Sequence, residues 1–147
     1  MNLKNKVVAI TGGASGLGEA TLRNFVANGA KVAILDLNVD NANKLVDELG
    51  SDNVLFIQTN IMEEQPVIDA VNKIEETFGA LHVCVNCAGT GYGGRIIGKD
   101  GPHPLDHFKF IIDLNLVGTF NVMRLAAVLM DKNEGDENGE KGVIINT

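Results

Sequence analysis

K-V-V-A-I-T-G-G-A-S-G-L-G, residues 6–18, is the stretch that decides how this chain folds. Its apolar start predicts a buried strand, and the residues from about Gly16 predict a helix. The glycines at 12, 16 and 18 allow a tight turn and let backbone approach a ligand closely. The helix N-terminus would offer free N–H groups to an anion such as a pyrophosphate. A plain tight turn would use the same glycines, so the interpretation depends on the rest of the chain.

The remaining sequence repeats this alternation of strand and helix. Strands are expected at 6–11, 31–36, 53–58, 81–86 and 142–146, and helices at 16–28, 39–49, 67–78 and 105–130. A glycine-rich loop is expected over 89–104 and a polar loop over 131–141. Short apolar strands separated by helices indicate right-handed βαβ units and a parallel sheet. The fold class is therefore α/β, a Rossmann-type doubly wound sheet that stops after its fifth strand.

Composition limits the class of protein. A chain of 147 residues with 45% hydrophobic residues suits one globular domain, residues 1–147. The net charge of −7 and the lack of clustered Lys and Arg argue against nucleic acid and anionic membranes as partners. The apolar stretch 108–130 contains Lys109, Asp113 and Arg124, which a membrane span tolerates poorly. With no signal or transit peptide seen, we expect the cytoplasm, or a similar reducing space such as the mitochondrial matrix.

The two cysteines form a C-x-x-C pair, Cys84 and Cys87. Such a pair can serve redox chemistry or bind a metal. Residues three apart on a strand point to opposite faces, however, and no second cysteine pair completes a zinc site. Packing on a strand is therefore the favoured interpretation.

Two other patterns resemble metal sites, and neither is supported. His103 and His107 bracket Pro104, which disfavours one helical face that carries both rings. The stretch D-K-N-E-G-D-E-N-G-E, residues 131–140, places Gly135 and Asp136 where a calcium loop needs an acid and then a glycine. No metal site is expected.

Asp36 ends the second predicted strand, 18 residues beyond Gly18. That spacing is typical of the acid that binds the adenosine ribose of a dinucleotide. A carboxylate there would repel a 2′-phosphate, and no Arg or Lys follows in D-L-N-V-D-N, so NAD is expected over NADP. The alternative is an ordinary aspartate that caps the next helix.

Residues after the third and fourth strands complete a groove at the same edge of the sheet. Asn60 and Ile61 occupy the place where an adenine ring would lie. Ala88 and Gly89 are small and leave room for a flat ligand.

Asn115 lies on an otherwise apolar helical stripe that contains Phe108, Ile111, Ile112, Thr119, Val122 and Met123. A buried amide must find hydrogen-bond partners. Two interpretations stay open: a satisfied core amide, or a scaffold of a catalytic site that holds water or bends the helix.

Four motifs in order along the chain resemble the short-chain dehydrogenase/reductase family. They are TGGASGLG at 11–18, Asp36, NCAG at 86–89 and Asn115 in DLNLVGTFNV. The resemblance extends from Lys6 to Thr147. The VNCAG variant, the long 90–104 segment and the acidic insert before KGVIINT look most like the type II 3-hydroxyacyl-CoA dehydrogenases, also described as type 10 17β-hydroxysteroid dehydrogenases.

The resemblance implies NAD(P)-linked oxidation of a secondary alcohol, with 3-hydroxyacyl-CoA as the expected substrate, and Asp36 makes NAD the expected cofactor. It implies a cofactor site made of Gly12, Ser15, Gly16, Leu17, Gly18, Asp36, Asn60, Ile61, Cys87, Ala88 and Gly89. Most relatives have an aspartate where Asn60 stands. An amide oxygen there can still accept a hydrogen bond from the adenine amino group.

Asn115 would be the first member of the family's catalytic tetrad. The other members are Ser, Tyr and Lys in Y-x-x-x-K, but the only tyrosine here, Tyr92, is followed four residues later by Ile96. We therefore expect the N-terminal, cofactor-binding part of an enzyme that is a homo-oligomer, a tetramer through the 105–130 helix, when complete. The alternatives are a non-catalytic nucleotide-binding module and an inert fragment.

Overall fold

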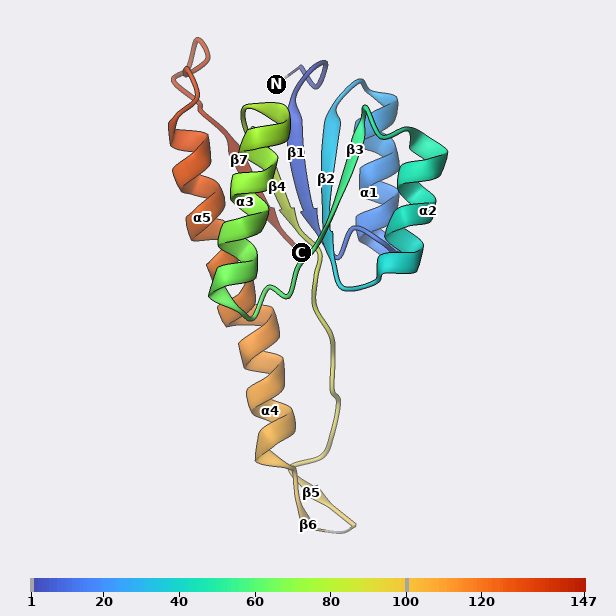
Figure 1. The fold of residues 1–147 in the computed structure, drawn as a ribbon. Coiled ribbons are helices and arrows are strands. Elements are labelled where there is room, and N and C mark those ends of the chain that lie inside the picture. Colours follow the sequence, from blue (N-terminus) through green and yellow to red (C-terminus); the bar gives the residue numbers. More distant parts are fainter. Residues whose placement is uncertain (1, 100) are drawn as a thin grey trace.

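Apolar strands lie side by side in one parallel sheet, with the order β3-β2-β1-β4-β7 (Figure 1). The computed structural model describes residues 2–99 and 101–147. The strands are β1 (Val7–Thr11), β2 (Lys31–Asp36), β3 (Val54–Gln58), β4 (Val83–Asn86) and β7 (Val143–Asn146). The predicted Rossmann-type sheet is thus confirmed, and its boundaries differ from the expected ones by two residues at most. β7 lies at the end of this order, with β4 as its neighbour in the described part of the chain.

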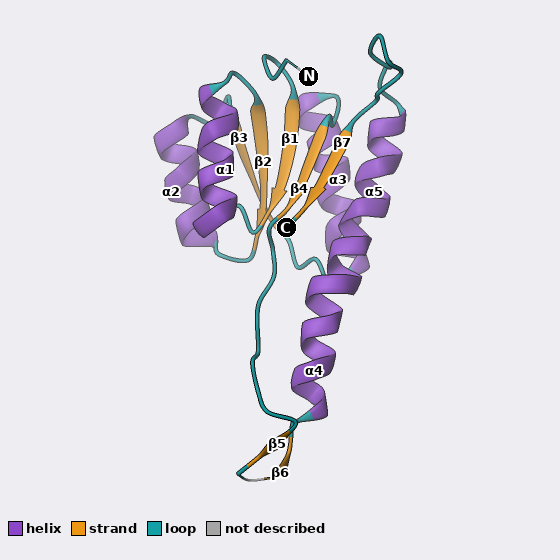
Figure 2. Cartoon of the chain, turned by 180° about the vertical axis from the view of Figure 1, so that it is seen from behind, coloured by secondary structure: helices purple, strands orange, loops and turns teal. Residues whose placement is uncertain are grey.

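Helices cover both faces of the sheet (Figure 2). The helices α1 (Gly16–Ala27) and α2 (Val39–Leu49) lie on one face, and α3 (Glu64–Phe78) and α5 (Thr119–Asp131) lie on the other. Side chains alternate along each strand, so β1 sends Val8 and Ile10 to the first face and Val7 and Ala9 to the second. Two apolar layers result, and β1, with a neighbour on each side, is buried along its whole length.

The two cysteines belong to opposite layers. Cys84 is fully buried on the α3–α5 face, whereas Cys87 packs against the α1–α2 face. Both thiols are free, and burial raises the pKa of Cys84 to about 12. A thiol with such a pKa holds its proton at neutral pH, which fits packing rather than redox chemistry.

The predicted helix over 105–130 is right in extent and wrong in geometry. It begins as α4 (Leu105–Ile112), passes through the π-helix η1 (Asp113–Gly118) and continues as α5. The expected apolar stripe is not buried along its length, since Phe108 is 57% exposed and Ile112 36% exposed, while Val122 is buried. A π-helical turn adds a residue to the repeat and rotates the helix beyond it, so a 3.6-residue stripe cannot continue through it.

The segment before this helix forms part of an arm that reaches beyond the C-terminal edge of the sheet (Figure 2). We define the arm as the described residues of 90–112. It contains a short antiparallel hairpin of β5 (Ile97–Gly98) and β6 (Gly101–Pro102), where the sequence predicted only a loop. Two-residue strands carry too little pattern to be seen in the sequence.

The continuous helical run Leu105–Asp131 passes, on length and composition alone, as a helix able to cross a membrane. Its second half nonetheless packs on α3 and the sheet through Val122, Ala126 and Leu129. Arg124 lies in the same half and is engaged with polar partners of the domain. The run therefore includes a helix that packs in the core, and such helices can meet the same criteria of length and composition as a membrane-spanning helix.

The polar segment 131–141 is a solvated turn, as expected. The Asp136 carboxylate accepts hydrogen bonds from the backbone N–H groups of Asn138 and Glu140, both at 2.9 Å. No group of three or more His, Cys, Asp or Glu side chains within 2–99 and 101–147 is arranged to hold a metal ion.

His82 ties the start of β4 to β1, because its Nδ1 accepts a hydrogen bond from the Val7 N–H at 3.1 Å. Only neutral imidazole can accept there. Desolvation and, to a lesser degree, the charge of Lys6 lower the pKa of His82 below its ordinary 6.5. The unfolded chain therefore binds a proton at a higher pH than the folded chain does.

We expect the free energy of unfolding to fall as the pH drops below about 6.5, because proton uptake by unfolded His82 favours the unfolded state. The His82→Asn variant keeps an acceptor near Nδ1 but does not titrate, and its stability should depend less on pH between 7.5 and 5.5. Urea denaturation across that range measures both. Parallel profiles for the two proteins would contradict this role of His82.

Candidate functional site

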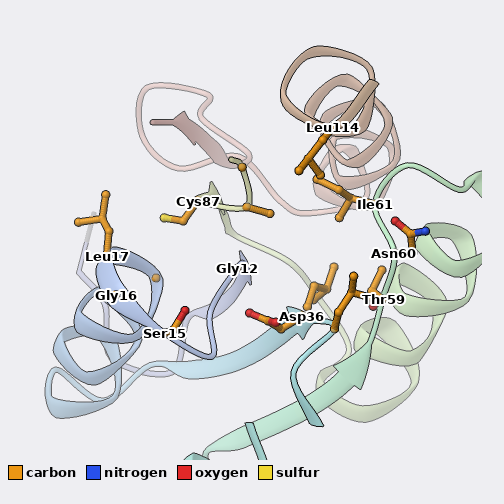
Figure 3. Close-up of a pocket in the computed structure, with 15 residues that line it drawn as sticks. Gly12, Ser15, Gly16, Leu17, Asp36, Thr59, Asn60, Ile61, Cys87 and Leu114 are labelled. Atoms are coloured by element: carbon orange, nitrogen blue, oxygen red, sulfur yellow. The ribbon is translucent and has the colours of Figure 1, made fainter. Parts of the chain in front are cut away.

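A cleft of about 380 Å³ opens at the C-terminal edge of the sheet (Figure 3). It lies at the end of β1, which has β2 and β3 on one side and β4 and β7 on the other. All eleven residues predicted for a cofactor line it. Its walls are formed by Gly12, Ser15, Gly16, Leu17, Gly18, Leu35, Asp36, Leu37, Thr59, Asn60, Ile61, Cys87, Ala88, Gly89 and Leu114. An open α/β sheet binds its ligands at this place, where the strand order reverses.

The floor of the cleft is the turn from β1 into α1. Gly12 has a φ of +64°, and a Cβ there would lie 2.8 Å from the backbone nitrogen of Ala88. A Cβ on Gly18 would lie 2.1 Å from the carbonyl oxygen of Gly12. Both positions therefore require glycine, one for its backbone conformation and both for close backbone contact. The turn brings the first turn of α1 directly onto the end of β1.

The start of α1 presents unpaired N–H groups. Ser15 is the N-cap in extended conformation, and in the described chain no side chain caps this helix. The first intrahelical bond recorded at the cap runs from the Glu19 N–H to the Ser15 carbonyl. The N–H groups of the first turn and the helix dipole thus remain available for an anion.

Asp36 lies across the cleft from this helix start. Its Oδ2 accepts the Ala14 N–H at 3.0 Å and its Oδ1 accepts the Asn38 N–H at 2.9 Å (Figure 3). The cap of α2 is Asn38, which accepts the Asn41 N–H at 3.1 Å, so the helix-cap interpretation of Asp36 is wrong. Each carboxylate oxygen keeps a second lone pair for a ligand.

One end of the cleft is apolar. Ile61, which follows β3, lies next to Leu114 of η1 (Figure 3). Asn60 lines the same end, but its amide is engaged within its own loop: Nδ2 donates to Glu63 Oε1 at 2.6 Å, and Oδ1 accepts the Met62 N–H at 3.2 Å. The expected pairing of that oxygen with adenine therefore depends on its second lone pair.

The opposite wall follows β4. The Ala88 N–H donates to Thr11 Oγ1 at 3.1 Å, which holds the small residues close to β1. Burial raises the pKa of the Cys87 thiol beside them. A Cβ on Gly89 would lie 3.0 Å from Asn115 Oδ1, so this wall and η1 touch.

Asn115 fits neither a core amide nor a residue of the cleft lining. Its side chain is exposed, lies within η1 and bridges both backbone groups of Thr90. Oδ1 accepts the Thr90 N–H at 3.0 Å and Nδ2 donates to the Thr90 carbonyl at 2.8 Å. π-helical turns often occur at functional sites, and this one fixes the chain that leaves β4. The scaffold interpretation of Asn115 is the one that this geometry supports.

Comparison with known proteins adds to this geometry. The family model described as short chain dehydrogenase matches residues 6–147. The chain belongs to the short-chain dehydrogenase family. Curated relatives include the 3-hydroxyacyl-CoA dehydrogenases type-2 of Drosophila melanogaster, 42% identical over 99% of this chain, and of Homo sapiens, 40% identical over 99%. The crystal structure of 3-hydroxyacyl-CoA dehydrogenase type-2 from Mycobacterium avium superposes on 99% of the chain with a TM-score of 0.90 and 37% identity.

The chain spans little more than half the length of these relatives. It covers 57% of the Drosophila protein, 56% of the human protein and 58% of the mycobacterial chain. The matched region of the solved structure is its N-terminal part. The Rossmann-like half of a short-chain dehydrogenase is therefore what the structure describes.

Sequence reasoning missed four residues of the cleft: Leu35, Leu37, Thr59 and Leu114. Three are neighbours of predicted residues, so their positions at strand ends were a usable signal. Leu114 comes from a helix distant in sequence, and no local pattern relates it to Ile61.

A polar ladder beneath the cleft was missed as well. Asn86 Nδ2 donates to Asn146 Oδ1 at 2.8 Å, and the Thr147 hydroxyl donates to the Asn86 carbonyl at 3.0 Å. The Thr11 hydroxyl points to Asn86 Oδ1 at 3.5 Å. These contacts join β1, β4 and β7 at the C-terminal ends of the strands.

We expect Gly18→Ala to lower the free energy of unfolding by about 1–3 kcal/mol, because its Cβ would displace the Gly12 carbonyl. Gly91→Ala is the matched control, since a Cβ there meets nothing within 4 Å. Urea denaturation of both variants measures the difference. Equal stability of the two variants would mean that the turn relaxes freely around a side chain at 18.

Proposed function

We propose that this chain is the cofactor-binding part of an NAD-dependent oxidoreductase that oxidises a secondary alcohol. One observation carries the proposal. The unpaired N–H groups of α1 and the carboxylate of Asp36 face the same cleft, at the strand edge where this fold binds dinucleotides. Belonging to the short-chain dehydrogenase family supports an NAD(P)-linked reaction.

Different parts of the cleft would bind different parts of the dinucleotide. The turn from Gly12 to Gly18 receives the pyrophosphate, because it combines backbone N–H groups with space that side chains would fill. Asp36 accepts the ribose hydroxyls through the lone pairs that Ala14 and Asn38 leave free. Ile61 and Asn60 border the adenine, and the wall of Cys87, Ala88 and Gly89 closes the other side. Bound NAD would supply the hydride acceptor.

Electrostatics favour NAD over NADP. Among the described residues that line the cleft, Asp36 is the only charged one. A 2′-phosphate beside it would meet a carboxylate and no neutralising cation, which is costly at close range. A ribose hydroxyl would instead donate to that carboxylate in a charge-assisted hydrogen bond.

The substrate is proposed from the Drosophila and human relatives, which are 3-hydroxyacyl-CoA dehydrogenases. Asn115 acts as a positioning residue, since its amide fixes Thr90, which follows the cleft wall after β4. The family's Ser, Tyr and Lys have no counterpart in the 147 residues. An amide offers no general acid or base, so we propose that turnover needs residues beyond Thr147.

The test uses the full-length protein, a short-chain 3-hydroxyacyl-CoA and either NAD or NADP. We expect reduction of NAD in preference to NADP. The Asp36→Ala variant should bind NAD more weakly by about 1.5–3 kcal/mol, the loss of a hydrogen bond to a charged group. Calorimetric titration measures the affinity, and absorbance of the reduced nicotinamide measures the rate.

Asp40→Ala is the control, because Asp40 is an exposed acid of α2 outside the cleft. Tighter binding of NADP than NAD by the parent would refute the role of Asp36. Turnover by a homogeneous 147-residue sample, verified by intact mass, would refute the need for further residues. NAD binding without turnover by the full-length protein would favour a non-catalytic module instead.

We also propose that the complete protein is a homo-oligomer, a tetramer through the helical run from Leu105 to Asp131. Large apolar side chains on this run face solvent, among them Leu105, Phe108, Phe110, Leu116, Val117, Phe120 and Val128. So many large exposed apolar side chains along one helical run support an interface there. The edge strand β7 adds Val143 and Ile145, both partly exposed.

Sedimentation velocity tests the assembly. We expect a tetramer for the full-length protein, and an aggregating or marginally stable 147-residue chain, because its apolar arm and sheet edge would lack partners. Phe120→Lys, which places a charge on the exposed face, should dissociate the tetramer. A soluble 147-residue monomer at micromolar concentration would contradict this proposal.

The proposed compartment is the cytoplasm or another reducing space. Both cysteines are free thiols, and they lie in opposite layers of the core, where a disulfide between them would distort the strand. Fractionation of cells that express the full-length protein tests this assignment.

A further inference from the structure

Asn121 of α5 contacts the loop that leaves β3 through two side-chain hydrogen bonds. Its side chain is 8% exposed, and its Nδ2 donates to the carbonyls of Ile61 and Glu63, both at 3.1 Å. Its Oδ1 accepts a hydrogen bond from Arg124 at 2.8 Å, and Arg124 also pairs with Glu64 at 2.6 Å. Every hydrogen-bonding group of this buried amide is therefore used.

The loop that Asn121 contacts, residues 60–63, is held by the packing of the Ile61 side chain in the core and by few hydrogen bonds to the rest of the fold. Its remaining hydrogen bonds, such as the one from the Glu63 N–H to the Asn60 carbonyl, are internal or belong to the start of α3. Within the described chain, Asn121 alone supplies hydrogen bonds to this loop from another part of the fold. This loop contributes Asn60 and Ile61 to the cleft, so Asn121 supplies the hydrogen bonds that hold the backbone of that wall, while core packing holds the Ile61 side chain.

Gly118, three residues earlier, makes the contact close. A Cβ at this position would lie 2.9 Å from Ile61 Cγ1 and 3.0 Å from its Cδ1. The last residue of η1 therefore packs its bare backbone against the Ile61 side chain, while Asn121 holds the Ile61 carbonyl. Together they fix both the backbone and the side chain of Ile61.

The same helical run thus holds both walls of the cleft. Asn115 bonds Thr90 after β4, and Asn121 bonds Ile61 after β3. Asn115 lies within the π-helical turn η1, and Asn121 lies in the first turn of α5, which continues the same run.

We infer that Asn121 is a positioning residue for the adenine end of the cofactor cleft. This inference rests on the proposed function, since it requires NAD in the cleft. It assigns Asn121 no contact with the ligand. Asn121 acts through Ile61, whose side chain must already lie at the cleft wall when adenine arrives, so that binding does not have to order the loop.

The test is calorimetric titration of the full-length protein with NAD and with AMP, which carries only the adenine end. The Asn121→Leu variant keeps the volume and removes both donors. We expect the Kd for NAD to rise about tenfold, as for one or two lost hydrogen bonds, and the Kd for AMP to rise by the same factor. The number of sites per folded protein should stay at the parent value.

Asn133→Leu is the matched control. Asn133 uses the same chemistry far from the cleft, because its Nδ2 donates to the carbonyls of Leu81 at 2.6 Å and Lys141 at 2.8 Å. It should lower the melting temperature and leave both Kd values within about twofold. If Asn121→Leu also lowers the melting temperature and the number of competent sites but leaves both Kd values unchanged, the role of Asn121 is purely structural. That result would overturn the inference.

Arg124→Met is the second variant and decides the matter if Asn121→Leu does not fold. It leaves the Asn121 donors in place but frees the amide to turn, so the Kd for NAD should rise about threefold. If the parent binds NAD and AMP and the variants bind them with unchanged affinity, this inference is refuted and the proposed function is not. A parent that binds neither ligand refutes the proposed function, and this inference with it.

Discussion

The close approach of Gly18 to the carbonyl oxygen of Gly12 governs the architecture of this domain. Because no side chain fits between them, α1 starts directly above the end of β1 rather than at the end of a longer loop. Its free N–H groups then face the sheet edge instead of solvent. The same turn leaves Gly12 in contact with the backbone of Ala88, so β1, α1 and the wall after β4 are fixed relative to one another by one tight bend.

Side-chain hydrogen bonds join this turn to the neighbouring segments of the cleft. Asp36 ties the turn to β2 through the Ala14 N–H, Thr11 ties it to the wall after β4, and Asn115 ties that wall to η1. Each tie pairs a side chain with a backbone group in a place where strands and helices end and backbone donors lack regular partners. The cleft is therefore preorganised by the hydrogen-bonding needs of the element ends themselves, and a ligand meets a surface that is already formed.

The sequence allowed the sheet, the helices and the local part of the cleft to be predicted, because these depend on periodicity and on residues next to strand ends. Gly12, Gly18 and Asp36 could be identified from their spacing together with their places after the first predicted strand and at the end of the second. The π-helix could not be predicted, since its residues D-L-N-L-V-G are compatible with an ordinary α-helix. The short hairpin in the arm was missed because two-residue strands carry too little pattern. The contact of Asn121 with Ile61 was missed because the two residues are distant in sequence.

The double engagement of Asp36 restricts how this protein can change over evolutionary time. Its carboxylate faces the cleft and also accepts the Ala14 N–H of the glycine turn. Any residue that replaces it to admit a phosphorylated ribose must either keep an acceptor for that N–H or leave it unpaired. Replacement by Arg, the single step that would best neutralise a phosphate, supplies no acceptor at all. A lineage that exchanges one dinucleotide for the other would therefore have to alter position 36 and the turn together, which makes the change a joint event rather than a drift through single substitutions.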